Sequence, residues 1–249
     1  MPLPLPPLPD PHARWAVFLD VDGTLLDFDD DPGAVRVGPI VLHTLAALRD
    51  ALDGALALVS GRRLADLDRL IGASGWAAAG LHGLERRRAD GRELDVRSDP
   101  ATRDALRLGA TALAAALPGV RLEDKGACIA LHFREAPQHA DALRRQVSEL
   151  AAQLDGYEVQ PGDHVFELKP AGIDKGRAIA AFLDEPPFAG RTPVYLGDDL
   201  TDEHAFAVVN ARGGVSVRVG DRAPSAARFT LHNPAAVQTW LDRVLAHLT

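Results

Sequence analysis

An apolar run that ends on two aspartates constrains this chain more than any other segment. Residues 15–19 read Trp-Ala-Val-Phe-Leu and are followed by Asp20-Val21-Asp22-Gly23-Thr24. The run predicts a buried strand, and open α/β sheets carry their chemistry on loops at the carboxyl ends of such strands. Asp20 is placed to act as a carboxylate nucleophile, Asp22 to transfer a proton, and Thr24 to contact a phosphate oxygen.

The same loop is also typical of a plain turn, because Asp and Gly favour turns for backbone reasons. A calcium loop is set aside, since the twelfth residue counted from Asp20 is Asp31 rather than glutamate and a strand precedes the loop. The acidic run at residues 27–31 is expected to be a solvated surface turn. The rest of the chain must therefore decide between a turn and a site.

Composition excludes several classes of protein. The chain has 249 residues, of which 47% are hydrophobic and 25% charged, and its net charge of −8 argues against a nucleic-acid binder. No apolar run approaches the roughly 20 residues of a membrane span. A single cysteine, Cys128, excludes an internal disulfide and fits a reducing cytosol. We expect a cytoplasmic monomer that acts on a small molecule, with no nucleic-acid or membrane partner.

The order of predicted elements indicates a core domain interrupted by an insertion. Residues 1–14, rich in proline, are expected to form a disordered tail. Alternating apolar strands and helices in residues 15–97 and 171–249 predict a doubly wound, mostly parallel sheet. Residues 98–170 instead read helix, hairpin, helix, hairpin, which predicts a small α+β cap domain.

A second apolar strand, residues 55–59, ends in Ser60-Gly61-Arg62. A right-handed parallel crossover brings Ser60 to the same sheet edge as Asp20, where its hydroxyl and the amides of the next helix could hold an anion. The alternative is that Ser60 only caps that helix.

A third strand end supplies more acids, in the run Gly197-Asp198-Asp199-Leu200-Thr201-Asp202. Asp20 and Asp198, with the backbone carbonyl of Asp22, would suit Mg²⁺, which prefers hard oxygen ligands. Asp199 and Asp202 are candidates for holding a lysine, metal-bound water or a loop in place. An acidic helix start explains Asp202 equally well.

Lys175 stands at a predicted helix start, where the helix dipole disfavours a cation. Such a placement indicates a role in offsetting the aspartates and binding a phosphate oxygen. A solvated lysine is the alternative.

Together these four motifs (Asp-x-Asp-Gly-Thr, Ser-Gly-Arg, Lys-Gly and Gly-Asp-Asp) resemble those of the haloacid dehalogenase (HAD) superfamily of phosphatases. The resemblance implies an aspartyl-phosphate on Asp20, acid/base catalysis by Asp22, a phosphoryl group held by Ser60 and Lys175, and an Mg²⁺ site completed by Asp198.

The insertion carries polar residues at its predicted strand ends, namely Glu123, Lys125, His132, Arg134 and Glu167. Carboxylates and cations together suit sugar hydroxyls, which both donate and accept hydrogen bonds. We expect the insertion to close as a lid over the sheet edge and to select the substrate. The alternative is that these are ordinary solvent-facing positions of alternating strands.

A narrower resemblance runs from about Trp15 to the last helix. It rests on Phe18–Leu25, Leu58–Arg62, Gly80–Gly83, Glu123–Gly126, Leu131–Arg134, Glu167–Pro170, Asp174–Gly176 and Gly197–Glu203, which are similar to motifs of the trehalose-6-phosphate phosphatases. The resemblance implies hydrolysis of that sugar phosphate, with Glu123, Lys125, Arg134 and Glu167 holding the sugar and Arg62 and Gly83 also near the substrate. The chain departs from the family at Asp163, where a basic residue is common.

Several other functions use similar parts. A phosphatase for sucrose 6-phosphate or a mannosyl phosphoglycerate, and a mutase, share the same aspartyl-phosphate chemistry. A phospho-acceptor signalling module needs neither Asp22 nor an inserted cap, and both count against it. A sugar-phosphate sensor without turnover stays open.

Overall fold

The computed structural model describes residues 3–10, 12–27, 37–72, 75–95 and 99–249. Apart from Asp27, the expected acidic turn at residues 27–31 lies outside the described residues. The chain divides into two compact units. Unit 1 comprises Met1–Asp95 and Asp174–Thr249, and unit 2 comprises Val96–Ile173, where the sequence predicts an insertion at 98–170.

Unit 1 is built on an eight-stranded sheet with the order β12-β11-β10-β1-β2-β3-β4-β5. Its centre is β1 (Trp15–Leu19), which pairs in parallel with β10 (Thr192–Gly197) on one side and β2 (Leu56–Val59) on the other. The outer strands are β3 (Ala78–Gly80), β4 (Glu85–Arg87), β5 (Glu93–Asp95), β11 (Val215–Val219) and β12 (Phe229–Leu231). Neighbours from β12 to β3 are parallel, whereas β3, β4 and β5 pair antiparallel. The strand order therefore reverses at β1, and the crevice at its carboxyl end is where such sheets bind ligands.

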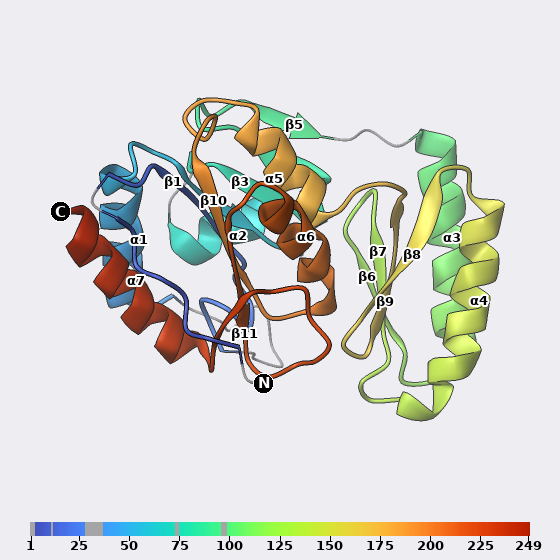
Figure 1. Ribbon diagram of the computed structural model, residues 1–249. Coiled ribbons are helices and arrows are strands. Elements are labelled where there is room, and N and C mark those ends of the chain that lie inside the picture. Colours follow the sequence, from blue (N-terminus) through green and yellow to red (C-terminus); the bar gives the residue numbers. More distant parts are fainter. Residues whose placement is uncertain (1–2, 11, 28–36, 73–74, 96–98) are drawn as a thin grey trace. The chain divides into compact units, whose positions relative to one another are not determined.

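Helices cover both faces of this sheet, and the central strands β1 and β2 are accordingly apolar along their whole length. All five residues of β1 and all four of β2 are buried. In Figure 1, α1 packs with α7 on one side of the sheet and α5 with α6 on the other. The helical segments of unit 1 are α1 (Pro39–Ala51), α2 (Leu64–Ile71), α5 (Lys175–Leu183), α6 (Glu203–Ala211), α7 (Pro234–Leu248) and the short turns η1 (Leu81–Gly83) and η3 (Leu200–Asp202). Within the described residues, no helix has the length and apolar character needed to cross a membrane.

The proline-rich start of the chain corrects one expectation. We predicted a disordered tail, but residues 3–10, here called the N-terminal strap, lie against unit 1. Leu3 and Leu8 pack on its apolar core. Thr230 N donates to Pro4 O at 3.0 Å, and Trp240 Nε1 donates to Pro7 O at 3.2 Å. Prolines lack an N–H group but keep a carbonyl acceptor, so a polyproline segment can still be bound through its carbonyl oxygens.

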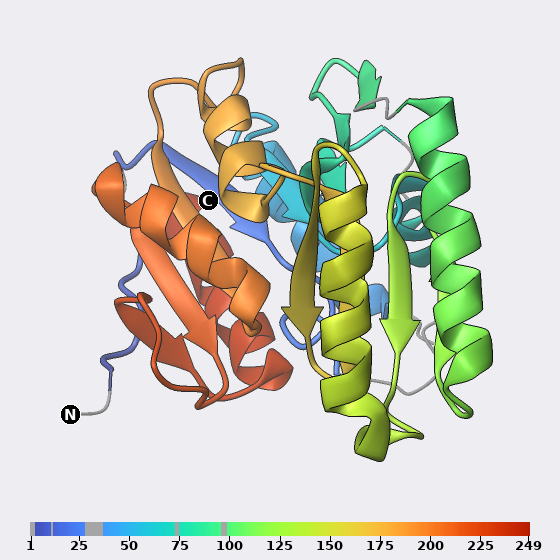
Figure 2. The same cartoon turned by 90° about the vertical axis from the view of Figure 1, so that its right-hand side faces the viewer.

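Unit 2 is a four-stranded antiparallel sheet with two helices on one face. The strand order is β6-β7-β9-β8. Figure 2 shows α3 and α4 side by side over this sheet. Leu131, Phe166 and Leu168 pack with both helices in a separate apolar core. The elements are α3 (Pro100–Ala116), β6 (Arg121–Asp124), β7 (Ile129–His132), η2 (Pro137–His139), α4 (Ala140–Gln153), β8 (Tyr157–Gly162) and β9 (Val165–Pro170). The predicted α/β core with an inserted α+β unit is therefore confirmed.

Candidate active site

Two strand ends at the centre of the unit 1 sheet bring Asp20 and Asp198 together. Asp20 follows β1, its amide donates to Leu196 O at 3.0 Å, and its side chain is buried. Asp198 follows the neighbouring β10 and accepts a hydrogen bond from Thr24 Oγ1 at 3.1 Å. Gly23 makes this approach possible, because a Cβ at that position would lie 2.2 Å from Asp198 Oδ2. The loop after β1 thus packs directly on the second acidic strand end.

Lys175 lies at the same edge, on the first turn of α5. Its Nζ is 3.0 Å from Asp20 Oδ1 and 2.6 Å from Asp202 Oδ1. Burial opposes the charge on Lys175, but the carboxylates of Asp20 and Asp202 outweigh burial and raise its pKa. The lysine is therefore buried between two carboxylates rather than solvated.

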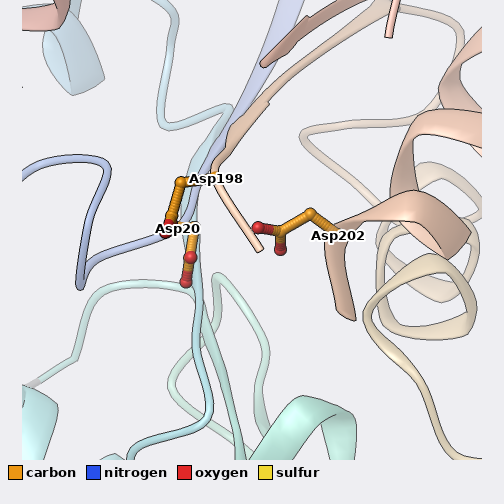
Figure 3. Close-up of side chains that lie close together, drawn as sticks. All are labelled: Asp20, Asp198 and Asp202. Atoms are coloured by element: carbon orange, nitrogen blue, oxygen red, sulfur yellow. The ribbon is translucent and has the colours of Figure 1, made fainter. Parts of the chain in front are cut away.

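Three carboxylates converge at this edge of the sheet. Asp20, Asp198 and Asp202 each offer an oxygen, and these oxygens lie within 4.8 Å of one another (Figure 3). Burial raises the pKa of Asp20 well above its ordinary value, although Lys175 opposes the shift. Burial and then the charge of Asp202 raise the pKa of Asp198 to about 7. Burial is the main cause of both shifts, and the neighbouring carboxylates add to it while Lys175 opposes it.

Asp22 and Arg62 form a two-point ion pair across the same loops. Arg62 Nε donates to Asp22 Oδ2 at 2.7 Å, and its second nitrogen, Nη2, donates to Asp22 Oδ1 at 2.6 Å. A fork of this kind fixes the carboxylate's orientation as well as its position. The predicted proton-transfer residue and the predicted substrate-facing arginine are therefore direct neighbours.

Ser60 is buried where β2 ends, and its side chain does not cap α2. Its Oγ accepts from the amide of Arg62 at 3.1 Å. The N-cap position of α2 is Arg63, which makes no side-chain capping bond, and the free amide of Leu64 is satisfied by Glu85 Oε2 at 2.7 Å. The helix-cap alternative for Ser60 is therefore wrong.

The turn η1, which contains Gly83, lies against the Ser60 loop. Leu81 N donates to Arg62 O, and His82 N donates to Ser60 O, each at 2.9 Å. Leu81, His82 and Gly83 all have positive φ, of 48°, 58° and 113°. The two nonglycine residues carry backbone strain, which typically accumulates at functional sites.

Asp199 and Asp202 share one motif but differ in their other contacts. Together they form a capping box at η3, in which Asp199 N donates to Asp202 Oδ2 at 2.8 Å. Asp202 is fully buried and reaches Lys175, whereas Asp199 Oδ1 accepts from the amide of Leu200 at 2.6 Å. Asp199 thus stabilises the loop, and Asp202 joins the loop to the lysine.

Unit 2 holds its own cluster of the predicted sugar-binding residues. Lys125 Nζ lies 2.7 Å from Glu167 Oε1 and 3.8 Å from Glu123 Oε2. His132 Nε2 lies 3.0 Å from Glu123 Oε2. Burial opposes the charge on Lys125, but the two glutamates outweigh burial and raise its pKa. These charges occupy the sheet face opposite the apolar residues that pack on α3 and α4, because neighbours along a strand alternate between faces.

Arg134 forms its ion pair with Asp163, at the position where the resemblance implies a basic residue. Its Nη2 lies 2.7 Å from Asp163 Oδ2, and Asp163 Oδ1 also lies 2.8 Å from His164 Nδ1. Both members of the pair are exposed. Of the four predicted sugar-binding residues, Glu123, Lys125 and Glu167 therefore form one cluster, and Arg134 pairs with Asp163 instead.

Two residues beside the acidic cluster lie outside the motifs that predicted the site. Tyr195, in the otherwise apolar middle of β10, donates its hydroxyl to Asp202 Oδ1 at 2.5 Å. A polar aromatic residue within an apolar strand was the available signal. Arg222 Nε donates to Asp198 O at 3.2 Å, and both residues line a hollow of about 310 Å³ together with Gly23. Arg222 follows β11 in a loop that no motif marks.

Comparison with known proteins assigns the family. A family model described as trehalose-phosphatase matches residues 18–235. The chain belongs to the trehalose-phosphatase family. The trehalose-6-phosphate phosphatase of Escherichia coli (strain K12) is 43% identical over 245 residues, which cover 98% of this chain and 92% of that one. The predicted resemblance, and with it the class of phosphoric monoester hydrolases, is confirmed.

Solved structures with similar coordinates show the same fold as this member of the trehalose-phosphatase family. The C-terminal domain of trehalose-6-phosphate phosphatase from C. albicans matches with a TM-score of 0.82 at 21% identity, over 94% of this chain and 93% of that one. A haloacid dehalogenase-like hydrolase from Bacteroides thetaiotaomicron matches with a TM-score of 0.67 at 17% identity, over 94% of this chain and 100% of that one. The fold is accordingly HAD-like.

Proposed function

We propose that this protein hydrolyses trehalose 6-phosphate to trehalose and inorganic phosphate, in a reaction that depends on Mg²⁺ and passes through an aspartyl-phosphate. The observation that carries the proposal is the buried Asp20 carboxylate, which lies between Lys175 and Asp198 at the end of the central strand. Membership of the trehalose-phosphatase family supports the choice of sugar.

Each residue of unit 1 has a defined task in this reaction. A carboxylate oxygen of Asp20 attacks phosphorus, and the bond from phosphorus to the sugar oxygen breaks. Asp22 gives a proton to the departing sugar oxygen and later accepts one from the water that hydrolyses the aspartyl-phosphate. Ser60, Thr24 and Lys175 bind the equatorial phosphoryl oxygens, on which charge is spread in the transition state.

The donor set fits Mg²⁺. Carboxylate oxygens of Asp20 and Asp198 and the main-chain carbonyl of Asp22 are the hard ligands that this ion prefers. Burial and then the charge of Asp202 raise the pKa of Asp198 to about 7, and a bound cation would offset both effects. When bound, Mg²⁺ supplies positive charge beside the transferring phosphoryl group. Asp202 stays outside this set because both of its oxygens already accept hydrogen bonds.

The residues of unit 2 provide the selection of the sugar in this proposal. Glu123 and Glu167 accept hydrogen bonds from sugar hydroxyls, and Lys125 donates to them. Arg134 belongs to the same group, while Arg62 and Gly83 of unit 1 contact the substrate near its phosphate. We further propose that the protein works as a monomer in the cytoplasm, to be checked by light scattering and by cell fractionation.

The direct test is release of phosphate from purified protein supplied with Mg²⁺. Trehalose 6-phosphate, sucrose 6-phosphate, a mannosyl phosphoglycerate and p-nitrophenyl phosphate form the panel. We expect the largest kcat/KM on trehalose 6-phosphate and none for Asp20→Asn. Faster turnover of another sugar ester would reject the substrate and keep the chemistry. No turnover of any ester, with the substrate bound, would instead indicate a sensor.

One observation favours the second candidate, a phosphatase for another sugar phosphate. Asp163 neutralises Arg134 through an ion pair at 2.7 Å, at a position where a basic residue is common in the family. Asp163→Asn removes this pair without changing the shape of the side chain. If Arg134 binds trehalose 6-phosphate, the variant has a lower KM for that ester and an unchanged KM for p-nitrophenyl phosphate.

A further inference from the structure

Tyr195 is a buried tyrosine in contact with the lysine–aspartate cluster. Its side chain is fully buried, and its hydroxyl donates to Asp202 Oδ1 at 2.5 Å. The same oxygen accepts from Lys175 Nζ at 2.6 Å. Lys175 in turn lies 3.0 Å from Asp20 Oδ1. Four side chains thus form one continuous chain of hydrogen bonds from the interior of β10 to Asp20.

We propose that Tyr195 is a positioning residue for the phosphatase reaction, which orients Asp202 so that Asp202 holds Lys175 beside Asp20. The inference rests on the proposed function, since it assigns Tyr195 to the step in which Asp20 attacks phosphorus. Tyr195 itself touches neither the substrate nor the phosphoryl group. It acts through Asp202 and Lys175.

The hydrogen bonds of Lys175 explain why the position of Asp202 Oδ1 matters. A lysine ammonium has three N–H donors and no acceptor. In the described part of the chain, two of these donors are directed at Asp20 and Asp202, which leaves the third for a phosphoryl oxygen. The direction of that third donor depends on where Asp202 Oδ1 lies. Asp199 N holds only the other carboxylate oxygen, Oδ2.

The surroundings of Tyr195 fix both ends of its side chain. The ring packs against Phe206 of α6, with ring centroids 5.6 Å apart and planes inclined by 59°. A Cβ on Gly197, two residues further along β10, would lie 2.4 Å from Asp202 Cγ, so the strand leaves room for this carboxylate. A buried hydroxyl is costly unless it is hydrogen-bonded, and a core position with packing alone as its task would favour Phe. The hydroxyl therefore has a purpose beyond packing.

The experiment compares Tyr195→Phe with Tyr157→Phe in the full chain. Tyr157 is the chain's other tyrosine, and its hydroxyl donates to a backbone carbonyl, Ala127 O, at 3.0 Å in unit 2. Each variant loses one hydroxyl with one hydrogen bond. With Mg²⁺ and trehalose 6-phosphate, we expect Tyr195→Phe to lower kcat about tenfold, because a hydrogen bond to a charged group is lost. KM stays within about twofold, and Tyr157→Phe leaves kcat unchanged.

Two results would overturn the proposal. A purely structural role predicts a lower Tm for Tyr195→Phe with wild-type kcat at temperatures where the variant is folded. An effect that bypasses Asp202 predicts that Tyr195→Phe lowers kcat by the same factor in an Asp202→Asn background. We expect the second substitution to add little there, since both act on Lys175.

A binding measurement separates this proposal from the choice of substrate. Orthovanadate, in the presence of Mg²⁺, imitates the transferring phosphoryl group and needs no sugar. We expect its Kd, measured by calorimetry, to rise about tenfold in Tyr195→Phe and to stay unchanged in Tyr157→Phe. If wild-type protein fails to hydrolyse trehalose 6-phosphate, the proposed function is wrong while this comparison still tests the positioning role. Equal affinities in all three proteins would reject that role.

Discussion

Two lysines in this molecule each lie between two carboxylates, and their exposure differs. In unit 1, the side chains of Lys175, Asp20 and Asp202 are 3%, 6% and 0% exposed. In unit 2, those of Lys125, Glu167 and Glu123 are 13%, 9% and 52% exposed. The first cluster is closed and its geometry is fixed, as a reaction that depends on preorganised charge requires. The second is partly hydrated, so its members can exchange water for the hydroxyls of a sugar.

A lysine between two carboxylates thus serves a different purpose at the end of a buried sheet than on an open sheet face. The unit 1 cluster lies at the ends of buried parallel strands, and the unit 2 cluster lies on the polar face of an antiparallel sheet. We therefore expect substitutions in unit 1 to affect every phosphate ester, and substitutions in unit 2 to affect only the sugar ester.

Asp20→Asn replaces the proposed nucleophile by an amide of the same shape. We expect kcat to fall about a thousandfold or more on both trehalose 6-phosphate and p-nitrophenyl phosphate, because no phosphoenzyme can form. Phosphate release with Mg²⁺ measures this. Asp53→Asn, at an exposed aspartate that pairs with Arg191, is the control and should retain activity. Wild-type rates for Asp20→Asn would contradict the role of Asp20 as the nucleophile.

Asp22→Asn removes the proton donor but leaves Asp20 in place. We expect multiple-turnover rates to fall about 100- to 10,000-fold on the sugar ester, which is the usual range for loss of acid/base catalysis. Slow formation of a phosphoenzyme should persist, and quenching after a single turnover would detect it by mass. A variant that turns over normally would contradict the assigned role of Asp22.

Lys125→Ala and Glu167→Ala test the other side of the comparison. We expect kcat/KM on trehalose 6-phosphate to fall about a hundredfold, while the value on p-nitrophenyl phosphate changes only a few-fold. Arg107→Ala, which breaks an ion pair with Asp124 elsewhere in unit 2, is the matched control. Equal losses on the two substrates would mean that unit 2 does not act through the sugar.

The smallest expected effect concerns the stability of unit 2 in acid. The hydrogen bond with His132, and more weakly Lys125, lower the pKa of Glu123 below its usual 4.5, although burial opposes them. A carboxylate with a depressed pKa stabilises the fold above its unfolded-state pKa, and this contribution is lost as the pH falls through the folded-state value. Glu123→Gln should therefore flatten the fall of Tm between about pH 5 and 3. The control is Glu149→Gln, at an exposed position on α4, which should leave the fall of Tm with pH unchanged. Superimposable curves for wild type and Glu123→Gln would contradict this.

The sequence was sufficient for the elements whose apolar pattern is continuous. The strand at Trp15–Leu19 lies where its apolar run predicts it, and α5 (Lys175–Leu183) begins at the predicted helix start. Long-range pairings were harder to predict. The short β12 (Phe229–Leu231) is defined mainly by its pairing with β11, and β4 and β5 join the main sheet although their sequence indicates only a hairpin.

The candidate site shows the same limit. Motifs at strand ends predicted which residues meet at the sheet edge, since parallel strands share that edge. They could not predict the fork between Arg62 and Asp22 or the pairing of Arg134 with Asp163, because side-chain partners depend on loop geometry. Tyr195 carries one signal, a hydroxyl within an apolar strand, but the sequence does not show which partner that hydroxyl meets.

The strap of prolines has a practical consequence for anyone who handles this protein. Pro4 and Pro7 accept hydrogen bonds from Thr230 on the outermost strand and from Trp240 on the final helix. If cleavage of an N-terminal affinity tag also removed these first residues, it would expose the amide of Thr230 and the apolar surface on which Leu3 and Leu8 pack. Other molecules could then bind there in a concentrated solution. Recombinant versions are therefore best extended at the opposite terminus, with the proline segment left whole.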